Sequence, residues 1–289
     1  MASASGVVQA RSRDIGGFRV RRLLPYAGGR MVGPIVFLDH MGPVSLPPGE
    51  GLDVRPHPHI GIATVTYLFE GELQHRDNAG FVQTIRPGDV NWMSAGRGVV
   101  HSERSTSAAR AAGVRLHGLQ CWVALPRLFE ETPPAFRHHP ASRLPVIRSE
   151  GVRLVLIAGR AFDRVSPAEV HSPMFYIDAQ IAAGAALDLP PEQPERAAYV
   201  VSGTMRIDGQ DHAEGALVLF TPGSTVRIEA AADARLALLG GRPLDEPRHI
   251  WWNFVSSSKE RIERAKADWK AQRFPRVPGD AEYTPLPEG

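Results

Sequence analysis

Residues 51–69 read GLDVRPHPHIGIATVTYLF, and residues 92–103 read WMSAGRGVVHSE. These two segments carry His57, His59, His101 and Glu103 on apolar runs that read as strands. Side chains two residues apart in a strand point to the same side of the sheet. His57 and His59 therefore share a face, and so do His101 and Glu103. If the two strands lie side by side with these faces inward, three imidazoles and one carboxylate meet, and we predict a metal site there.

The segments around these histidines read as short strands joined by turns. Residues 62–69, 81–85 and 90–93 read as strands, and residues 77–80 (DNAG) and 86–89 (RPGD) are turn signals. Strands at this spacing favour a closed barrel or a sandwich. An H-x-H pair by itself is also compatible with two ordinary histidines of a barrel, so the pair alone does not decide for a metal.

The overall composition limits the classes of partner. The chain has 289 residues with 33 basic and 31 acidic side chains, which leaves a formal charge of +2 and no strong field that would favour nucleic acid or a membrane surface. Cys121 is the single cysteine, so no internal disulfide can form, and no apolar run reaches the roughly 18 residues of a membrane-spanning helix. We expect a cytoplasmic protein whose partners are small molecules.

The second half of the sequence repeats the first. Tyr67, Gly71 and Leu73 correspond to residues 132 positions later, which are Tyr199, Gly203 and Met205. Gly88, Ser94 and Gly96 correspond to residues 127 positions later, which are Gly215, Thr221 and Gly223. This repeat predicts a duplicated barrel. The positions that correspond to the four candidate ligands hold Leu189, Pro191, Ile228 and Ala230. We therefore expect the second barrel to hold no metal of its own.

We expect two domains, over residues 1–135 and 136–289. Residues 126–145 read as the connection between them, because they are rich in proline, and residues 1–6 are expected to lack regular structure. After the second barrel, residues 258–272 read as an amphipathic helix with Ile262, Ala265 and Trp269 on one face. We place this helix and the Pro-rich tail in the second domain.

The motif frame resembles that of a known superfamily. Gly51-x5-His57-x-His59, Gly71, and Gly88-x5-Ser94-x-Gly96 with His101 resemble the two-part motif of the cupins. Three departures stand out: Thr64 replaces the usual glutamate, Ser94 replaces a common proline, and two extra residues precede His101. Those departures, together with strings at residues 13–25, 37–43, 56–61 and 92–103, resemble the pirin family over residues 13 to about 122, and more loosely to about 270.

The resemblance implies an all-β fold of two cupin barrels, also called double-stranded β-helices, that face each other, with a C-terminal helix. It also implies that the N-terminal barrel binds one metal through His57, His59, His101 and Glu103. Three imidazoles and a carboxylate without a thiolate suit divalent transition metals. Fe(II) is the expectation from the family, with Mn, Co, Ni, Cu and Zn as alternatives. Four protein ligands leave two positions of a six-coordinate metal open.

Two functions fit the resemblance. Bacterial pirins resemble cupin quercetin 2,3-dioxygenases, in which the partners are a small aromatic substrate and O2, and here Glu103 would also be the catalytic base. Eukaryotic pirins resemble non-enzymatic, redox-responsive regulators that bind protein partners. We favour the dioxygenase, because the chain has no nucleic-acid motif or basic stripe. Arg55, Arg97 and Ser102 are candidates for positions beside the metal or at the mouth of the barrel, with plain turn roles as the alternative, and His40 receives no role from the sequence.

Overall fold

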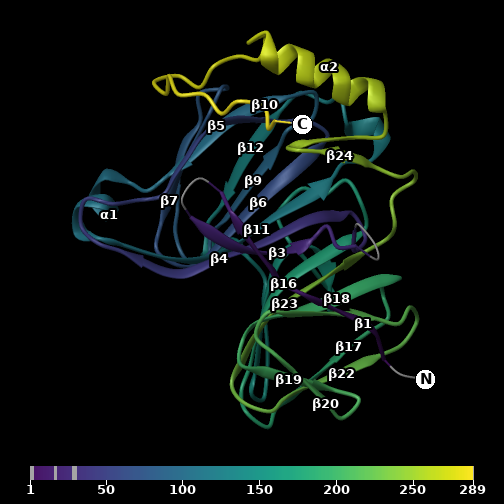
Figure 1. Ribbon diagram of the computed structural model, residues 1–289. Helices are drawn as coiled ribbons and strands as arrows, with labels where there is room; N and C mark the ends of the chain where they lie inside the picture. The colour runs from purple at the N-terminus through teal and green to yellow at the C-terminus, as the bar shows by residue number, and fades with distance from the viewer. Residues whose placement is uncertain (1–2, 16–17, 28–30, 289) are drawn as a thin grey trace. The chain divides into compact units, whose positions relative to one another are not determined.

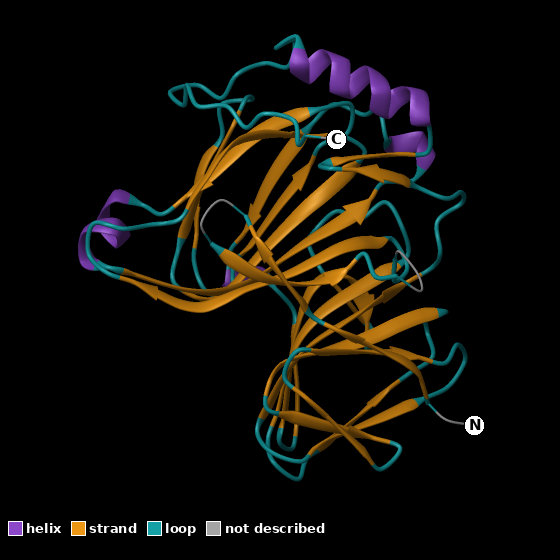
Figure 2. Cartoon of the chain, in the orientation of Figure 1, coloured by secondary structure: helices purple, strands orange, loops and turns teal. Residues whose placement is uncertain are grey.

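The computed structural model describes residues 3–15, 18–27 and 31–288 (Figure 1). Strands make up most of its regular structure (Figure 2), which confirms the expected all-β class. The chain forms two compact units. We call them the N-terminal barrel (residues 13–20, 40–141 and 245–289) and the C-terminal barrel (residues 1–12, 21–39 and 142–244). No helix in the described part of the chain is long and apolar enough to cross a membrane.

The N-terminal barrel is built from two antiparallel sheets. One contains the order β12-β9-β6-β11-β4 and the other the order β5-β10-β7-β8. The strands are β4 (Ile35–Leu46, shared with the other unit), β5 (Asp53–His59), β6 (Ile62–Glu70), β7 (Leu73–Asp77), β8 (Val82–Ile85), β9 (Val90–Ser94), β10 (Val99–Arg104), β11 (Val114–Ala124) and β12 (Ala135–His139). A short helix, α1 (Ser107–Ala112), joins β10 to β11.

The C-terminal barrel uses the same order of strands. Its sheets run β1-β21-β18-β23-β16-β14-β13 and β17-β22-β19-β20. The strands are β1 (Ala4–Gln9), β13 (Val146–Ser149), β14 (Val152–Ala161), β15 (Arg164–Val165), β16 (Met174–Ile181), β17 (Ala186–Leu189), β18 (Glu195–Ser202), β19 (Thr204–Ile207), β20 (Gln210–Ala213), β21 (Ala216–Phe220), β22 (Val226–Ala230) and β23 (Ala234–Gly241). The order β21-β18-β23-β16 matches β9-β6-β11-β4, which confirms the duplicated barrel.

The repeated glycines occupy equivalent turns. Gly71 and Gly203 both have φ +80°, and a Cβ on either would collide with a backbone carbonyl, that of Arg115 or of Asp233. A side chain is strongly disfavoured where φ is positive and the neighbouring backbone is this close. The two glycines are therefore fixed by the same turn geometry, which is why they recur in the sequence.

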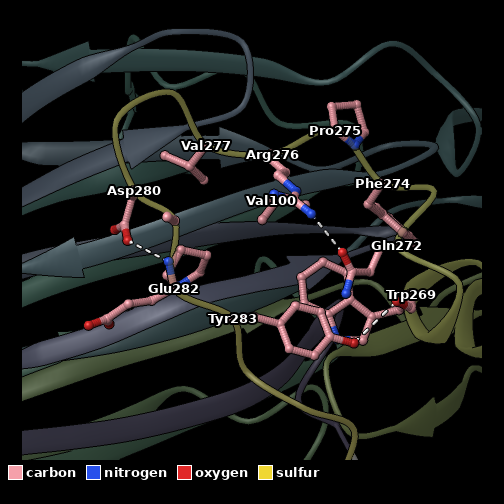
Figure 3. A pocket seen from close by; sticks show the side chains of 12 residues that line it. Val100, Trp269, Gln272, Phe274, Pro275, Arg276, Val277, Asp280, Glu282 and Tyr283 are labelled. Atoms are coloured by element: carbon pink, nitrogen blue, oxygen red, sulfur yellow. Dashed lines mark hydrogen bonds between the residues drawn. The ribbon is translucent and has the colours of Figure 1, made fainter.

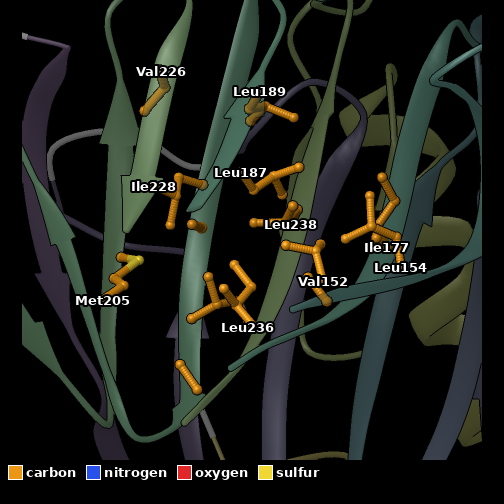
Figure 4. Close-up of a cluster of buried hydrophobic side chains, with 14 of the residues drawn as sticks. Val152, Leu154, Ile177, Leu187, Leu189, Met205, Val226, Ile228, Leu236 and Leu238 are labelled. Carbon is orange, nitrogen blue, oxygen red and sulfur yellow. The ribbon is translucent and has the colours of Figure 1, made fainter. Parts of the chain in front are cut away.

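The interior of the C-terminal barrel is apolar where the N-terminal barrel has histidines. Leu187, Leu189 and Ile228 belong to its buried core together with Met205 and Leu236 (Figure 4). The strand register pairs Ile228 with Leu187, in the way that His101 pairs with His57. By strand pairing, the residue equivalent to His57 is therefore Leu187, two residues before Leu189, which the sequence offset indicates. Both leucines are buried, so either alignment puts an aliphatic side chain there.

The C-terminal helix α2 (Lys259–Lys270) begins after Ser258, whose hydroxyl accepts a hydrogen bond from the amide of Arg261. Ile262, Ala265 and Trp269 are buried, as the amphipathic pattern predicts. Figure 1 shows α2 lying beside β5 and β10. The hairpin β24 (His249–Trp251) and β25 (Phe254–Ser256) precedes it.

The expected domain limits differ from the observed division at this helix. The buried face of α2 joins one apolar cluster with Ile60, Val100 and Phe254, so residues 245–289 belong to the N-terminal barrel. Burial of this face against strands far away in the sequence is what recruits the segment. Residues 135–139 are also more than a connection, because β12 pairs with β9.

At the other end of the chain, β1 pairs with β21, so residues 4–6 are ordered in a sheet, contrary to expectation. Met1 and Ala2 lie outside the described residues.

Candidate metal centre

The three histidines are brought together by two paired strands. β5 and β10 run antiparallel, with His57 directly opposite His101. Side chains alternate along both strands, so His57, His59 and His101 point to the barrel interior, while Pro56, Pro58 and Val100 point away from it. The side-by-side arrangement expected from the sequence is therefore present. A bulge between His101 and Glu103 interrupts the pairing.

The three imidazoles form a compact group. Ligand nitrogens of His57, His59 and His101 all lie within 4.8 Å of one another. The ring centroids are 4.4 Å apart for His57 and His101, 4.9 Å for His57 and His59, and 5.1 Å for His59 and His101. His59 and His101 are each 1% exposed. These separations are compatible with three nitrogens around a single transition-metal ion.

Hydrogen bonds at the Nδ1 atoms determine which nitrogens remain available. His57 Nδ1 donates to the Arg55 carbonyl at 2.8 Å, and His59 Nδ1 donates to the Asn253 carbonyl at 3.3 Å. A carbonyl only accepts, so Nδ1 carries the proton in both rings and Nε2 has a free lone pair. His101 Nε2 is buried and has no hydrogen-bond partner. A buried nitrogen without a partner is costly unless a ligand satisfies it, and metal coordination does so.

Burial also keeps these imidazoles uncharged. Desolvation lowers the pKa of His57 to about 4, and it lowers the pKa values of His59 and His101 well below the ordinary range, with the neighbouring imidazoles adding to the effect. The three rings are therefore neutral at pH 7. Neutral imidazole is the form that coordinates a metal, so the site needs no deprotonation at that pH.

Glu103 lies on β10 together with His101, but it does not belong to the group formed by His57, His59 and His101. Its Oε1 accepts a hydrogen bond from the Thr66 hydroxyl at 3.0 Å, and that hydroxyl also lies 2.8 Å from Gln120 Oε1. Burial raises the pKa of Glu103, although His75 and the Thr66 hydrogen bond act in the opposite direction. Whether Glu103 is a fourth ligand remains a proposal.

Sequence reasoning missed two polar residues beside the triad. His75 Nδ1 lies 3.3 Å from His101 Nδ1, and His75 Nε2 lies 3.1 Å from Asp77 Oδ2. Both residues are on β7, which pairs with β10 on the side opposite to β5. The available signal was the spacing: His75 and Asp77 are two residues apart in a strand and so share a face, as His57 and His59 do.

The four other residues named from the sequence do not belong to the triad. His40 Nε2 is 2.7 Å from His117 Nε2, and neither belongs to the triad. Arg55 and Arg97 are exposed. Ser102 is buried on the strand between His101 and Glu103, and its hydroxyl has no partner in the described structure.

A pocket of about 120 Å³ lies beside β5 and β10 (Figure 3). It is lined by Pro56 and Val100 from these strands, and by α2 and the tail that follows it. The rings of Trp269 and Tyr283 stack at 4.6 Å, and the Tyr283 hydroxyl donates to the Trp269 carbonyl. Because Pro56 and Val100 point away from the barrel interior, this pocket is separate from the metal centre.

Comparison with known proteins gives the same assignment over both barrels. Residues 17–123 match the pirin family, and residues 176–275 match the pirin C-terminal cupin domain. A pirin-like protein of Caulobacter vibrioides is 50% identical over 98% of this chain and 99% of its own. A Pseudomonas aeruginosa protein, provisionally named a quercetin 2,3-dioxygenase, is 40% identical over 96% of this chain and 84% of its own.

The solved structures extend this likeness to three dimensions. A crystal structure of quercetin 2,3-dioxygenase from Acinetobacter baumannii superposes with a TM-score of 0.90 and 33% identity, over 98% of this chain and 94% of that one. Matches of this extent cover the triad, the duplicated barrel and the C-terminal segment alike. The chain therefore belongs to the pirin family, with two cupin barrels of which the N-terminal one carries a buried triad of histidines.

Proposed function

We propose that this protein is a metal-dependent dioxygenase that cleaves flavonols such as quercetin with O2. The observation that carries the proposal is the triad, in which every Nδ1 is hydrogen-bonded and every Nε2 is left for a metal. The quercetin 2,3-dioxygenase names of the Pseudomonas and Acinetobacter proteins support the choice of substrate class.

His57, His59 and His101 would hold the metal, and Glu103 would be the fourth ligand. Donors of this kind suit Fe(II), Mn(II), Co(II), Ni(II), Cu(II) and Zn(II), and affinity alone does not select among them. We propose Fe(II). The bound metal would supply a Lewis acid for the substrate oxygens and a redox centre for O2.

The chain's own groups would handle the proton and the substrate ring. Burial raises the pKa of Glu103, and a carboxylate whose pKa lies closer to neutrality is a better proton acceptor for a flavonol hydroxyl. Trp122 lies against His59 with the ring centroids 5.0 Å apart, so an aromatic surface borders the triad. This surface would exclude water from the reacting end of the substrate.

Aerobic incubation with quercetin tests the proposal. Protein loaded anaerobically with Fe(II) is mixed with quercetin and air, and the loss of the flavonol absorbance is followed together with released carbon monoxide. We expect both signals from the wild type and neither from His101→Ala. Glu103→Gln should retain metal better than His101→Ala and still lose turnover, because it keeps an oxygen donor but not the base. Metal-loaded wild type that leaves quercetin intact contradicts the proposal. The alternative function, a redox-responsive regulator, would then be tested by capture of protein partners under reducing and oxidising conditions.

A further inference from the structure

We propose that Asp77 and His75 are positioning residues that hold His101 in the one tautomer able to bind a metal. The inference rests on the proposed metal centre, but its geometry is independent of which reaction the centre performs. It concerns three side chains in line, Asp77, His75 and His101, all buried between 1% and 3% exposed.

The line starts from a carboxylate fixed by the backbone. Asp77 Oδ1 accepts hydrogen bonds from the amides of Ala79 at 2.9 Å and Phe81 at 3.1 Å, across the turn that follows β7. These two bonds set the plane of the carboxylate. Asp77 Oδ2 is thereby directed at His75 Nε2, 3.1 Å away.

Asp77 decides the proton position on His75. A carboxylate only accepts, so His75 Nε2 must carry a proton and donate it to Oδ2. In its neutral form the imidazole has one N–H, and His75 Nδ1 then keeps a lone pair. The ring cannot easily turn to change this, because it stacks on Phe136 with 4.3 Å between the centroids and 15° between the planes.

His75 in turn decides the proton position on His101. The two Nδ1 atoms are 3.3 Å apart, and since His75 Nδ1 accepts, His101 Nδ1 must donate. His101 Nε2 then has its lone pair free, and this is the buried atom without a hydrogen-bond partner. Asp77, acting through His75, therefore sets the His101 tautomer that coordination requires.

His101 differs in this respect from the other two histidines of the triad. Backbone carbonyls orient His57 and His59, and no substitution removes a carbonyl. A side chain, that of His75, sets the tautomer of His101, so a mutation can reverse this tautomer without removing a ligand.

Asp77→Asn is the sharpest test. The amide oxygen can keep the two backbone hydrogen bonds, while the amide nitrogen replaces Oδ2 and donates to His75 Nε2. The proton of His75 then moves to Nδ1, and His101 Nδ1 must accept, which places the His101 proton on Nε2. An asparagine in place of an orienting aspartate disturbs a histidine tautomer in the same way in serine proteases. We expect the Zn(II) Kd, measured by chelator competition, to rise by roughly 10–100-fold.

Two further variants separate positioning from a loss of structure. His75→Phe preserves the stack on Phe136 and removes the proton chain, so Asp77→Asn should add nothing to the Kd in that background. His212→Phe is the matched control, because His212 is a buried histidine of the C-terminal barrel at 5% exposure, and it should leave the Kd unchanged.

The deciding readout needs no metal. Long-range ¹H–¹⁵N spectra of the metal-free protein report which nitrogen of His101 carries the proton. We expect Nδ1 in the wild type and Nε2 in Asp77→Asn. The inference is overturned if the wild type carries the proton on Nε2, or if Asp77→Asn changes neither the tautomer nor the Kd. A wild type that binds no Zn(II) would instead defeat the proposed function, while the spectra would still decide the inference.

Discussion

The buried ion pair between Glu130 and Arg248 allows a prediction with a magnitude. The side chain of Arg248 is fully buried and that of Glu130 is 6% exposed, and Arg248 Nε lies 2.8 Å from Glu130 Oε1. Glu130 also accepts from the Ser257 amide at 2.9 Å and from the Ser256 and Ser257 hydroxyls. The pair thus ties the loop after β11 to the segment that contains β24 and β25.

Glu130→Gln keeps the shape of the side chain and removes its charge. Breaking one partner of a buried pair costs about 3–5 kcal/mol. Arg248 retains Asp245 at 2.9 Å and the Leu125 and Glu246 carbonyls, so we expect the lower limit of about 3 kcal/mol. Glu131→Gln is the control, since Glu131 is 56% exposed and its pair with Arg261 is worth about 0–1 kcal/mol.

Guanidinium unfolding of the metal-free proteins measures the difference, with an unchanged m-value as the condition for comparing midpoints. The Asn253 carbonyl that orients His59 lies in the tethered segment, so Glu130→Gln should also weaken Zn(II) binding. Replacing both partners, by Glu130→Leu with Arg248→Met, should cost less than Arg248→Met alone. The reasoning is refuted if Glu130→Gln and Glu131→Gln lose the same stability.

Three further outcomes are expected. Zn(II) at 100 times its Kd should stabilise the wild type by about 2.7 kcal/mol and His101→Ala not at all, whereas the control His138→Ala should behave as the wild type. Equal thermal shifts on adding Zn(II) to the wild type and to His101→Ala would exclude the triad as the binding site. Gly71→Ala should destabilise far more than Gly209→Ala, because both have positive φ but only Gly71 faces a nearby carbonyl, and equal midpoints would contradict this. Burial raises the pKa of the Cys121 thiol, so native protein should resist iodoacetamide while unfolded protein reacts faster above pH ~8.5, and stability should fall above that pH because only the unfolded chain releases the proton.

The triad could be predicted from the sequence because the signal for it is local. The H-x-H pair and His101 depend on the two-residue period of a strand, and the structure brings the three rings together on β5 and β10. The duplicated barrel was predictable for a similar reason: glycines at positive φ cannot be replaced without strain, so they mark equivalent turns in both halves.

The remaining features depend on contacts between distant segments. Nothing in the helical pattern of α2 indicates that its apolar face covers Ile60 and Val100 rather than the barrel that precedes it in the chain. The role of His75 was equally hidden, because an H-x-D pair gains meaning only when β7 is known to lie next to β10. The position of Glu103 relative to a metal stays a prediction.

The discontinuous N-terminal barrel has a consequence for how the protein is made. The chain leaves this barrel after residue 141 and returns to it at residue 245, with Asn253 and the apolar face of α2 still to come. On the ribosome, the early strands must wait through the synthesis of the whole second barrel before Ile60 and Val100 are covered. The proposed metal site would therefore be completed only late in synthesis, and a fragment ending at residue 141 would leave Ile60 and Val100 uncovered, which would favour aggregation.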